Sequence, residues 1–378
     1  MYQKLLKFMG AGLLSVMVLA GCGADDTDGA EGNNDADGNG EAAAAENNNN
    51  NEENAANNGE NNAADNNDNG NEEAAGELEE VKIGATQIVE HPSLDAAFEG
   101  FKSALADNGY VEGENVSYNF QSAQGDQNNA NTIANNFVGD GVDMIFANST
   151  PSSLAALNAT GDIPIVFTSV TDAVGAGLVT ALDEPGENIT GVQDLHPEAI
   201  PMTVDFIETY FPDSTIGTIY NSGEQNSVAQ IETLEEAIDG TSLSLVTRSV
   251  STSAEVQQAA DSLAGDIDVF YIVTDNTVVS ALETVVATAN DHDIPLVVGE
   301  PDSLGRGGFA SYGIDYFTIG YRAGEMAAEI LKGEKTTLDF PVEDPPEMQL
   351  MINKEAAEQQ GVEWDGEWDS IAEFVESE

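Results

Sequence analysis

The chain has 378 residues, of which 69 are acidic and 10 are basic, so the net charge is −59. With so few basic side chains to neutralise phosphates, this composition excludes nucleic acid as a partner and argues against docking on an anionic membrane surface. The single cysteine excludes a disulfide framework and any cysteine metal site. Repulsion among the carboxylates is screened at high ionic strength, so we expect an acidic, halophilic type of protein from a saline habitat.

The N-terminus has the layout of a secretory signal peptide, with Lys4 and Lys7 before an apolar run over residues 8–20. This run is too short to span a bilayer as a free helix. It ends in Leu-Ala-Gly-Cys at residues 19–22, which resembles the lipobox of bacterial lipoproteins. The resemblance implies that residues 1–21 are removed and that Cys22 is lipidated, which would anchor the chain to the outer face of the cell membrane. A plain signal peptide with a chance cysteine is the alternative.

Residues 22–80 consist almost entirely of Asp, Glu, Asn, Gly and Ala, and there is no basic residue between Lys7 and Lys82. Such a segment lacks the apolar surface needed to offset the loss of chain entropy on folding. We therefore expect a disordered acidic tether between membrane and folded domain. A cation-binding tail is the competing interpretation.

Residues 81–194 alternate between strand and helix patterns. Strands are predicted over 81–86, 116–120, 142–147, 163–168 and 189–192, with helices around 94–105 and 130–138 and another from 150. The pattern then starts again. Strands are predicted over 215–220, 243–248, 267–273, 294–298 and 308–312, with helices around 228–238, 256–263, 278–289 and 319–330.

Strands separated by helices favour parallel sheets with right-handed crossovers, and the length of this region favours more than one core. We predict an α/β fold with two doubly wound parallel-sheet lobes facing each other across a ligand cleft. The strand over 308–312 is interpreted as returning to the first lobe. The predicted boundaries are 81–194 plus about 303–330 for lobe 1, 195–302 plus about 331–362 for lobe 2, and 363–378 for an acidic tail.

Four segments resemble the tryptophan/tyrosine-type ABC transporter substrate-binding proteins, in order along residues 81–362. They are Gln-Ile-Val-Glu-His-Pro-Ser-Leu-Asp at 87–95, Ala-Gln-Gly-Asp at 123–126, Ile-Pro-Ile-Val-Phe-Thr-Ser-Val-Thr-Asp at 163–172 and Tyr-Asn-Ser-Gly-Glu-Gln-Asn-Ser at 220–227. The resemblance implies a type I periplasmic-binding-protein fold that closes on a small molecule, an aromatic amino acid in some members. It also implies delivery to an ABC permease with a separate ATPase. The family usually has Asp-Pro where this chain has Asp172-Ala173.

Ligands of open parallel sheets bind beyond the carboxyl ends of the strands, so we place the site in the loops there. For a ligand carboxylate, Ser149 and Thr150 suit best, because hydroxyls before Pro151 indicate a helix N-terminus that favours an anion. Thr168 and Ser169 end the next strand and could share this group. An ordinary capped helix is the alternative.

For a ligand ammonium we favour Asp275, because a desolvated carboxylate pairs strongly with such a group. Asp172, Glu224 and Glu300 are rivals, and a plain helix N-cap is the alternative interpretation of Asp275. The predicted ligand-binding set is Gln87, His91, Ser149, Thr150, Thr168, Ser169, Asp172, Glu224, Asn226, Ser227, Asp275 and Asn276.

Catalysis is not expected. The domain has no Gly-x-Ser-x-Gly elbow and no cysteine nucleophile, and residues 305–308 lack the Lys-Ser/Thr of a phosphate-binding loop. We predict no metal, no cofactor and a monomer. Two alternatives remain open, since fold does not fix function. The chain could present its closed form to a membrane receptor as a sensor, or it could bind a solute other than an amino acid.

Overall fold

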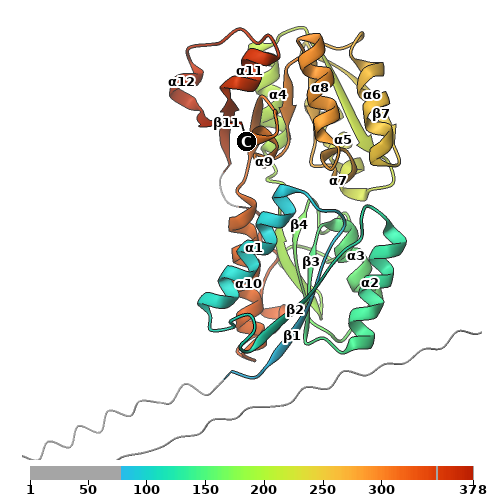
Figure 1. Cartoon of the computed structure of the whole chain (residues 1–378), viewed down its shortest axis with the longest axis vertical. Helices are drawn as coiled ribbons and strands as arrows, with labels where there is room; N and C mark the ends of the chain where they lie inside the picture. The colour runs from blue at the N-terminus through green and yellow to red at the C-terminus, as the bar shows by residue number, and fades with distance from the viewer. Residues whose placement is uncertain (1–77, 346–347, 378) are drawn as a thin grey trace, which may run out of the picture. The chain divides into compact units, whose positions relative to one another are not determined.

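The computed structural model describes residues 78–345 and 348–377, whose strands form two separate sheets, each covered by helices (Figure 1). The predicted signal peptide, the lipidated Cys22 and nearly all of the predicted tether lie outside the described residues. Within the described residues, no helix is long and apolar enough to span a bilayer.

The first sheet has the strand order β2-β1-β3-β4-β5, with every neighbouring pair parallel. Its strands are β1 (Val81–Gln87), β2 (Val116–Ser122), β3 (Met144–Asn148), β4 (Ile165–Val170) and β5 (Ile189–Gln193). One face is covered by α1 (Pro92–Asp107) and α10 (Tyr316–Leu331), the other by α2 (Gln127–Asp140) and α3 (Thr150–Ala159) (Figure 1). Each sheet face therefore has its own apolar core, as the doubly wound prediction requires.

Helices α1 and α10 come from opposite ends of the folded region and lie against each other at two glycines. A side chain at Gly100 would collide with the backbone of Phe317, and one at Gly320 would collide with the backbone of Ala97. The two backbones approach closely because neither position carries a Cβ. This contact fixes α10 on the first sheet, although the strand before it belongs to the second.

The second sheet has the order β12-β11-β10-β9-β8-β6-β7 and is parallel except for the antiparallel pair β10–β11. Its strands are β6 (Thr215–Asn221), β7 (Ser244–Val250), β8 (Val269–Ile272), β9 (Leu296–Val298), β10 (Ala310–Gly313), β11 (Gln349–Asn353) and β12 (Glu373–Val375). Its helices are α4 (Ala199–Tyr210), α5 (Gln225–Ala237), α6 (Val256–Leu263), α7 (Asn276–Val279), α8 (Leu282–His292), α9 (Asp302–Gly305), α11 (Lys354–Gln359) and α12 (Trp368–Ile371). The fold is thus the predicted α/β arrangement of two parallel-sheet lobes.

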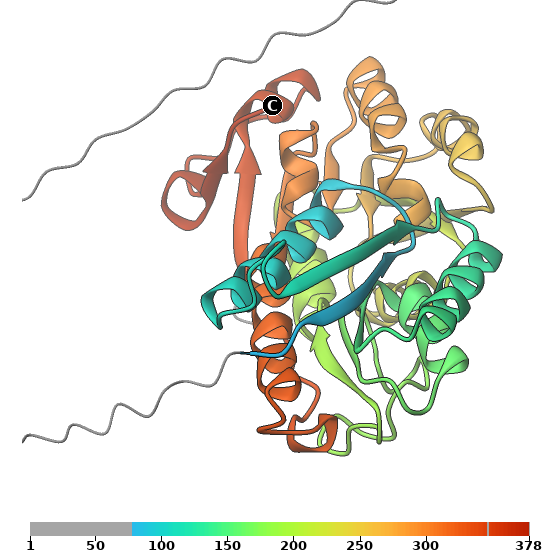
Figure 2. The same cartoon turned by 60° about the horizontal axis from the view of Figure 1, so that its bottom comes forward.

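Two predicted assignments are wrong. Strand β10 does not return to the first lobe: Ala310 pairs with Val297 of β9 and Ile352 of β11 in the second sheet. The predicted acidic tail is not a tail either, because it adds α12 and β12 to the edge of the second sheet (Figure 2). Trp368 of this segment is only 1% exposed, so the segment closes the core of the second lobe.

The chain crosses between the two sheets three times, after β5, after β10 and before β11. Side chains tie these crossings together. Gln193, at the end of β5, donates from Nε2 to Asp344 Oδ1 at 2.9 Å, which joins the first crossing to the third. Tyr316, which begins α10, donates its hydroxyl to Asp194 Oδ2 at 2.9 Å, which joins the second crossing to the first.

Candidate ligand-binding site

A small cavity of about 10 Å³ lies where loops of the two lobes meet. This volume is about enough for one water molecule, so an amino acid can enter only if the surrounding loops move apart. The first lobe and the crossings contribute the loop after β1 and the ends of β4 and β5. The second lobe contributes residues at the ends of β8 and β9 and the starts of α5 and α7. The lining residues are His91, Leu94, Ser169, Thr171, Asp194, Asn226, Thr274, Asn276, Glu300 and Tyr316.

Two carboxylates face this cavity from opposite lobes. Asp194 accepts the Tyr316 hydroxyl on Oδ2, while its Oδ1 atom is buried and has no partner. Burial raises the pKa of Asp194 to about 6, and the nearby charge of Glu300 acts in the same direction. Burial also raises the pKa of Glu300, against the opposing influence of Ser303 and Arg306. The cavity therefore presents negative charge that is costly to bury without a counter-ion.

Among the residues that the structure describes, no lysine or arginine lines the cavity, and its histidine does not supply the missing positive charge. Burial, followed by the nearby positive charge of Arg306, lowers the pKa of His91 to about 4. His91 is therefore neutral at physiological pH. A cationic group of the ligand is the charge that fits this cavity.

Several lining side chains have polar atoms that are buried but unpaired: His91 Nδ1, Asp194 Oδ1, Asn226 Oδ1 and Thr274 Oγ1. An unmade hydrogen bond of a buried group costs about 1–3 kcal/mol. Several such atoms around one cavity are expected where a bound molecule supplies the partners. Two of these atoms, on Asp194 and Asn226, are oxygens that can only accept.

The ends of β3 and β4 carry backbone strain beside the cavity. Ser149 and Ser169 follow or end these neighbouring strands and have positive φ angles of 116° and 57°. Such conformations cost about 1–3 kcal/mol and tend to occur at functional sites. The Ser169 hydroxyl donates to Asn148 Oδ1 at 2.7 Å, and Asn148 in turn donates to the Leu94 carbonyl at 2.7 Å. These bonds hold two lining residues in place from behind.

Four predicted ligand-binding residues line the cavity: His91, Ser169, Asn226 and Asn276. Ser149, Thr150 and Thr168 lie at the same strand ends but outside the lining. Ser149 accepts the Ser152 amide at 3.3 Å as the cap of α3, while Thr150 Oγ1 and Thr168 Oγ1 are buried without partners.

The placement of Asp275 corrects our prediction of the ammonium partner. Its Oδ2 atom accepts the Asn221 amide at 2.6 Å and its Oδ1 atom accepts the Val278 amide at 2.7 Å. Both oxygens are thus used by the backbone, and the residue does not line the cavity. Burial and the neighbouring Glu224 raise the pKa of Asp275 to about 7. The helix-cap interpretation, which the sequence left open, is the one that the structure supports.

The remaining predicted residues support the lining from outside it. Glu224 accepts from Asn276 Nδ2 at 2.6 Å and from Thr277 Oγ1 at 2.7 Å, which orients Asn276. Gln87 donates to Asp95 Oδ1 at 2.8 Å, and Ser227 is fully buried beside Asn226. Asp172 accepts the Gly175 amide at 2.8 Å and is not a lining residue.

Sequence reasoning missed Leu94, Thr171, Asp194, Thr274 and Tyr316 as cavity residues and ranked Glu300 only as a rival. Asp194 follows β5 directly, so applying the strand-end rule to that strand would have found it. Tyr316 was missed because the predicted helix began at residue 319, whereas α10 begins at Tyr316. Among the described residues, no group of three or more His, Cys, Asp or Glu side chains is arranged to hold a metal ion.

A family model described as ABC transporter substrate binding protein matches residues 82–373. The chain belongs to this family. It is 45% identical to a tyrosine-binding protein of Clostridioides difficile over 278 residues, 73% of this chain and 80% of that protein. The structure of an ABC domain from Streptococcus pneumoniae in complex with L-Trp is 30% identical, with a TM-score of 0.74 over 78% of this chain and all of that one.

A third relative is a substrate-binding protein with adhesive properties from Clostridium difficile, solved in a ligand-free, open form. It is 39% identical, with a TM-score of 0.59 over 79% of this chain and all of that one. These relatives support the tryptophan/tyrosine-type resemblance and the type I periplasmic-binding-protein fold. The chain is therefore an extracytoplasmic substrate-binding protein of the ABC transporter type and not an enzyme. Proteins of this kind bind a small molecule and work with an ABC permease.

Proposed function

We propose that this substrate-binding protein captures an aromatic amino acid, tyrosine or tryptophan, by closing its two lobes. The observation that carries the proposal is the pair of carboxylates, Asp194 and Glu300, in a cavity whose described lining contains no lysine or arginine. An α-ammonium group between them would neutralise charge that burial otherwise makes costly, and charge-assisted hydrogen bonds of this kind are strong. Asn226 Oδ1, unpaired in the same cavity, is a third acceptor for the ammonium.

The nonpolar part of the ligand would lie against Leu94 and the rings of His91 and Tyr316, which line the same space. A neutral imidazole can stack on an aromatic ring without bringing a second positive charge to the ammonium. The choice of an aromatic side chain draws support from the tyrosine-binding relative and from the relative in complex with L-Trp.

For the ligand carboxylate we retain the N-terminus of α3, with Ser149 and Thr150, and the neighbouring Thr168 and Ser169. The free amides of a helix N-terminus favour an anion. Thr150 and Thr168 each have a buried hydroxyl oxygen without a partner, and Ser169 reaches the cavity. Because Ser149 and Thr150 lie behind the present lining, this part of the proposal requires a small rearrangement when the ligand binds.

Comparison with the relatives supports a closed arrangement of the lobes. The chain is more identical to the ligand-free, open relative (39%) than to the L-Trp complex (30%), yet its TM-score is lower against the open form (0.59 against 0.74). Sequence divergence would produce the opposite order. Gln230 Nε2 of the second lobe also reaches Thr171 Oγ1 of the first at 3.5 Å. The ligand would select a closed state of this kind, with the cavity widened to admit it, because it contacts both lobes only there.

The remaining parts of the proposal concern the site of action. We propose that Cys22 is lipidated, that the acidic segment after it tethers the domain to the outer face of the membrane, and that the domain acts as a monomer. The closed form would deliver its ligand to the permease of an importer powered by a separate ATPase. A Cys22→Ser variant should lose incorporation of labelled fatty acid and appear in the medium instead of the membrane fraction.

The ligand proposal is tested by thermal unfolding of the purified protein with twenty amino acids, sugars, purines and polyamines. A ligand at about 100 times its Kd stabilises the folded state by about 2.7 kcal/mol, a shift of a few degrees in Tm. We expect tyrosine, tryptophan or phenylalanine to give the largest shift. Stabilisation by a solute without an amino group, and by no amino acid, would refute the proposal.

A further inference from the structure

The cavity carboxylate Asp194 is also part of the connection between the lobes. It follows β5 at the first crossing, and its backbone N–H donates to the Val170 carbonyl at 3.0 Å in the first lobe. Its Oδ2 atom accepts the Tyr316 hydroxyl at 2.9 Å from the second crossing. The other oxygen, Oδ1, is buried and unpaired in the cavity. Asp194 thus bonds to the second crossing through one carboxylate oxygen and leaves the other oxygen available to a ligand.

The residue before it extends the connection to the third crossing. Gln193 donates to Asp344 Oδ1 at 2.9 Å, and its backbone N–H donates to the Glu343 carbonyl at 2.8 Å. Gln193 Oε1 also accepts the Ala173 amide at 2.8 Å. The three crossings are therefore joined through two consecutive residues, one of which lines the cavity.

We propose that Asp194 and Tyr316 form a sensor that couples the charge of the ligand to the hinge, which consists of the three crossings between the lobes. Tyr316 is a positioning residue. Repulsion between Asp194 and Glu300 opens the empty cleft. This inference rests on the proposed amino-group ligand. Glu300 follows β9 of the second lobe, so the two carboxylates approach each other only when the lobes close. An ammonium between them would convert this repulsion into attraction.

The Tyr316 hydroxyl is suited to this role because it remains a donor. Burial and the charge of Asp194 hold the pKa of Tyr316 well above its usual value, so the phenol does not ionise near neutral pH. By donating to Oδ2 it directs Oδ1 at the cavity. Any shift of Asp194 towards a ligand is then transmitted to the first residue of α10, which is fixed on the first lobe by its contact with α1.

Helix α10 supplies a matched control for Tyr316. Tyr321, five residues later, donates its hydroxyl to Asp107 Oδ2 at 2.9 Å, which is also a tyrosine–aspartate bond, but it lies on the surface within one lobe. We compare Tyr316→Phe with Tyr321→Phe by calorimetry, using tyrosine and its desamino analogue 3-(4-hydroxyphenyl)propionate. Tyr316→Phe should weaken tyrosine binding about 10-fold to 100-fold, since hydrogen bonds to charged groups are worth about 1.5–3 kcal/mol.

Tyr316→Phe should change the affinity for the desamino analogue less than threefold. Tyr321→Phe should change the affinity for either ligand by no more than twofold. Equal losses for both ligands would assign Tyr316 a merely structural role and overturn the proposal. Equal effects of the two tyrosine substitutions would overturn it as well.

A second experiment uses no ligand, so it tests the proposed repulsion whatever the identity of the solute. Because Cys22 is the only cysteine, fluorophores can be attached through Asn136→Cys and Gln258→Cys, exposed positions on α2 and α6, in a Cys22→Ser background. At pH 8 and without ligand, Asp194→Asn should raise energy transfer, because removing one charge lets the empty cleft close. Unchanged or lower transfer would refute the opening force. If transfer rises but no amino acid binds, the sensor stands and the proposed ligand fails.

Discussion

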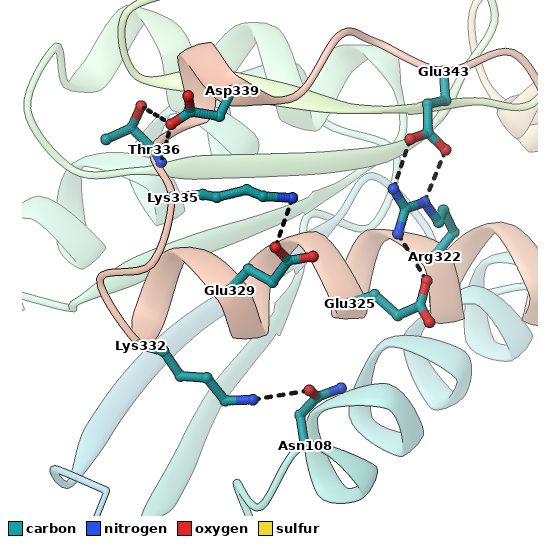
Figure 3. A network of polar contacts seen from close by, with 9 residues as sticks. All are labelled: Asn108, Arg322, Glu325, Glu329, Lys332, Lys335, Thr336, Asp339 and Glu343. Atoms are coloured by element: carbon teal, nitrogen blue, oxygen red, sulfur yellow. Dashed lines mark hydrogen bonds and ion pairs between the residues drawn. The ribbon is translucent and has the colours of Figure 1, made fainter.

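Arg322 of α10 holds Glu343 in a two-pronged ion pair, with its Nε and Nη2 atoms 2.8 Å and 2.7 Å from the two carboxylate oxygens (Figure 3). Glu343 is joined to β5 by backbone bonds to Gly191 and Gln193 and directly precedes the third crossing. The ion pair therefore fixes the point from which that crossing leaves the first lobe. Glu325 adds a second carboxylate to the same guanidinium at 2.8 Å.

We predict that Arg322→Lys increases the mobility of the third crossing, because an ammonium cannot make the paired contacts of a guanidinium. Hydrogen exchange of residues 340–345 should become faster, while the free energy of unfolding falls by about 1 kcal/mol or less, as for partly exposed ion pairs. The control is Lys332→Gln, which removes the bond from Lys332 Nζ to Asn108 Oδ1 beyond the end of the same helix (Figure 3). Equal exchange rates in the two variants would contradict the assigned role.

Binding should depend on pH through Asp194. Burial raises the pKa of this carboxyl to about 6, and a bound ammonium favours its ionised form. Below about pH 6, Asp194 must lose its proton before it can pair with the ammonium. The affinity should therefore be constant near pH 8 and fall as the pH drops through 6. The titratable groups that act on Asp194 are Glu300 and Tyr316, while His91 lines the same cavity and Arg306 and Asp302 lie near Glu300. Asp194→Asn should bind weakly at all pH values and lose most of this dependence.

Without ligand, the pH trend should be the opposite one, because protonation of Asp194 removes its repulsion with Glu300 and favours the closed, folded state. A buried carboxyl with a raised pKa binds its proton more tightly in the folded than in the unfolded state, so stability rises as pH falls from about 6 towards 4. Urea unfolding of the wild type and of Asp194→Asn, at pH 7.5 and pH 5, should therefore give a smaller gain on acidification in the variant. An equal gain in both proteins would mean that groups other than Asp194 determine the change in stability between pH 7.5 and pH 5.

The contact between α1 and α10 should not tolerate a side chain. Gly320→Ala would place a methyl group against the backbone of Ala97, and such overpacking typically costs about 1–3 kcal/mol or more. Gly139→Ala is the control: it lies in α2 with nothing near its missing Cβ, and the same substitution in a helix there should stabilise by about 0.5–1 kcal/mol. Chemical denaturation measures both. Similar changes in the two variants would contradict the close helix contact.

The C-terminal segment should be part of the stable core of the second lobe. Trp368 contacts Phe206, Phe309 and Tyr210, with ring centroids 5.9, 5.4 and 5.1 Å away. Trp368→Ala should cost about 3–5 kcal/mol, the usual range for a buried aromatic side chain. Ile371→Ala in the same short helix, 45% exposed, should cost well under 1 kcal/mol. Thermal unfolding distinguishes a core segment from a dispensable tail.

Salt should stabilise the folded protein. The chain has 69 acidic and 10 basic residues, and the described part contains six ion pairs, most of them partly exposed. Screening of carboxylate repulsion should raise Tm by several degrees between 10 mM and 1 M salt, since the Debye length falls from about 30 Å to about 3 Å. An unchanged Tm would argue against adaptation to a saline habitat.

The sequence predicted the two parallel-sheet lobes because strand and helix periods alternate clearly through both halves. The sequence placed β10 in the wrong sheet, because a short apolar strand has the same pattern in either sheet. Its sheet is determined by its pairing with Val297 and Ile352, which the pattern does not show. It also missed the last strand, since Phe374 and its neighbours lie in a very acidic stretch. Pairing with β11 and the burial of Trp368 override that composition.

The candidate site was predicted by region more accurately than by residue. Strand ends were the correct place, but whether a side chain there faces the cavity or caps a helix depends on its rotamer and neighbours. Asp275 follows β8 and Asp194 follows β5, yet both oxygens of Asp275 accept backbone amides while one oxygen of Asp194 has no partner. Sequence patterns do not contain that difference.

The most direct test of the account is calorimetry of the wild-type protein at pH 8 with tyrosine and with its desamino analogue, which differ only in the α-ammonium. If Asp194 and Glu300 form the ammonium site, tyrosine should bind at least 100-fold more tightly, since leaving buried charges without a partner costs several kcal/mol. Equal affinities would show that the two carboxylates do not recognise the ligand, and the account of closure built on them would be wrong.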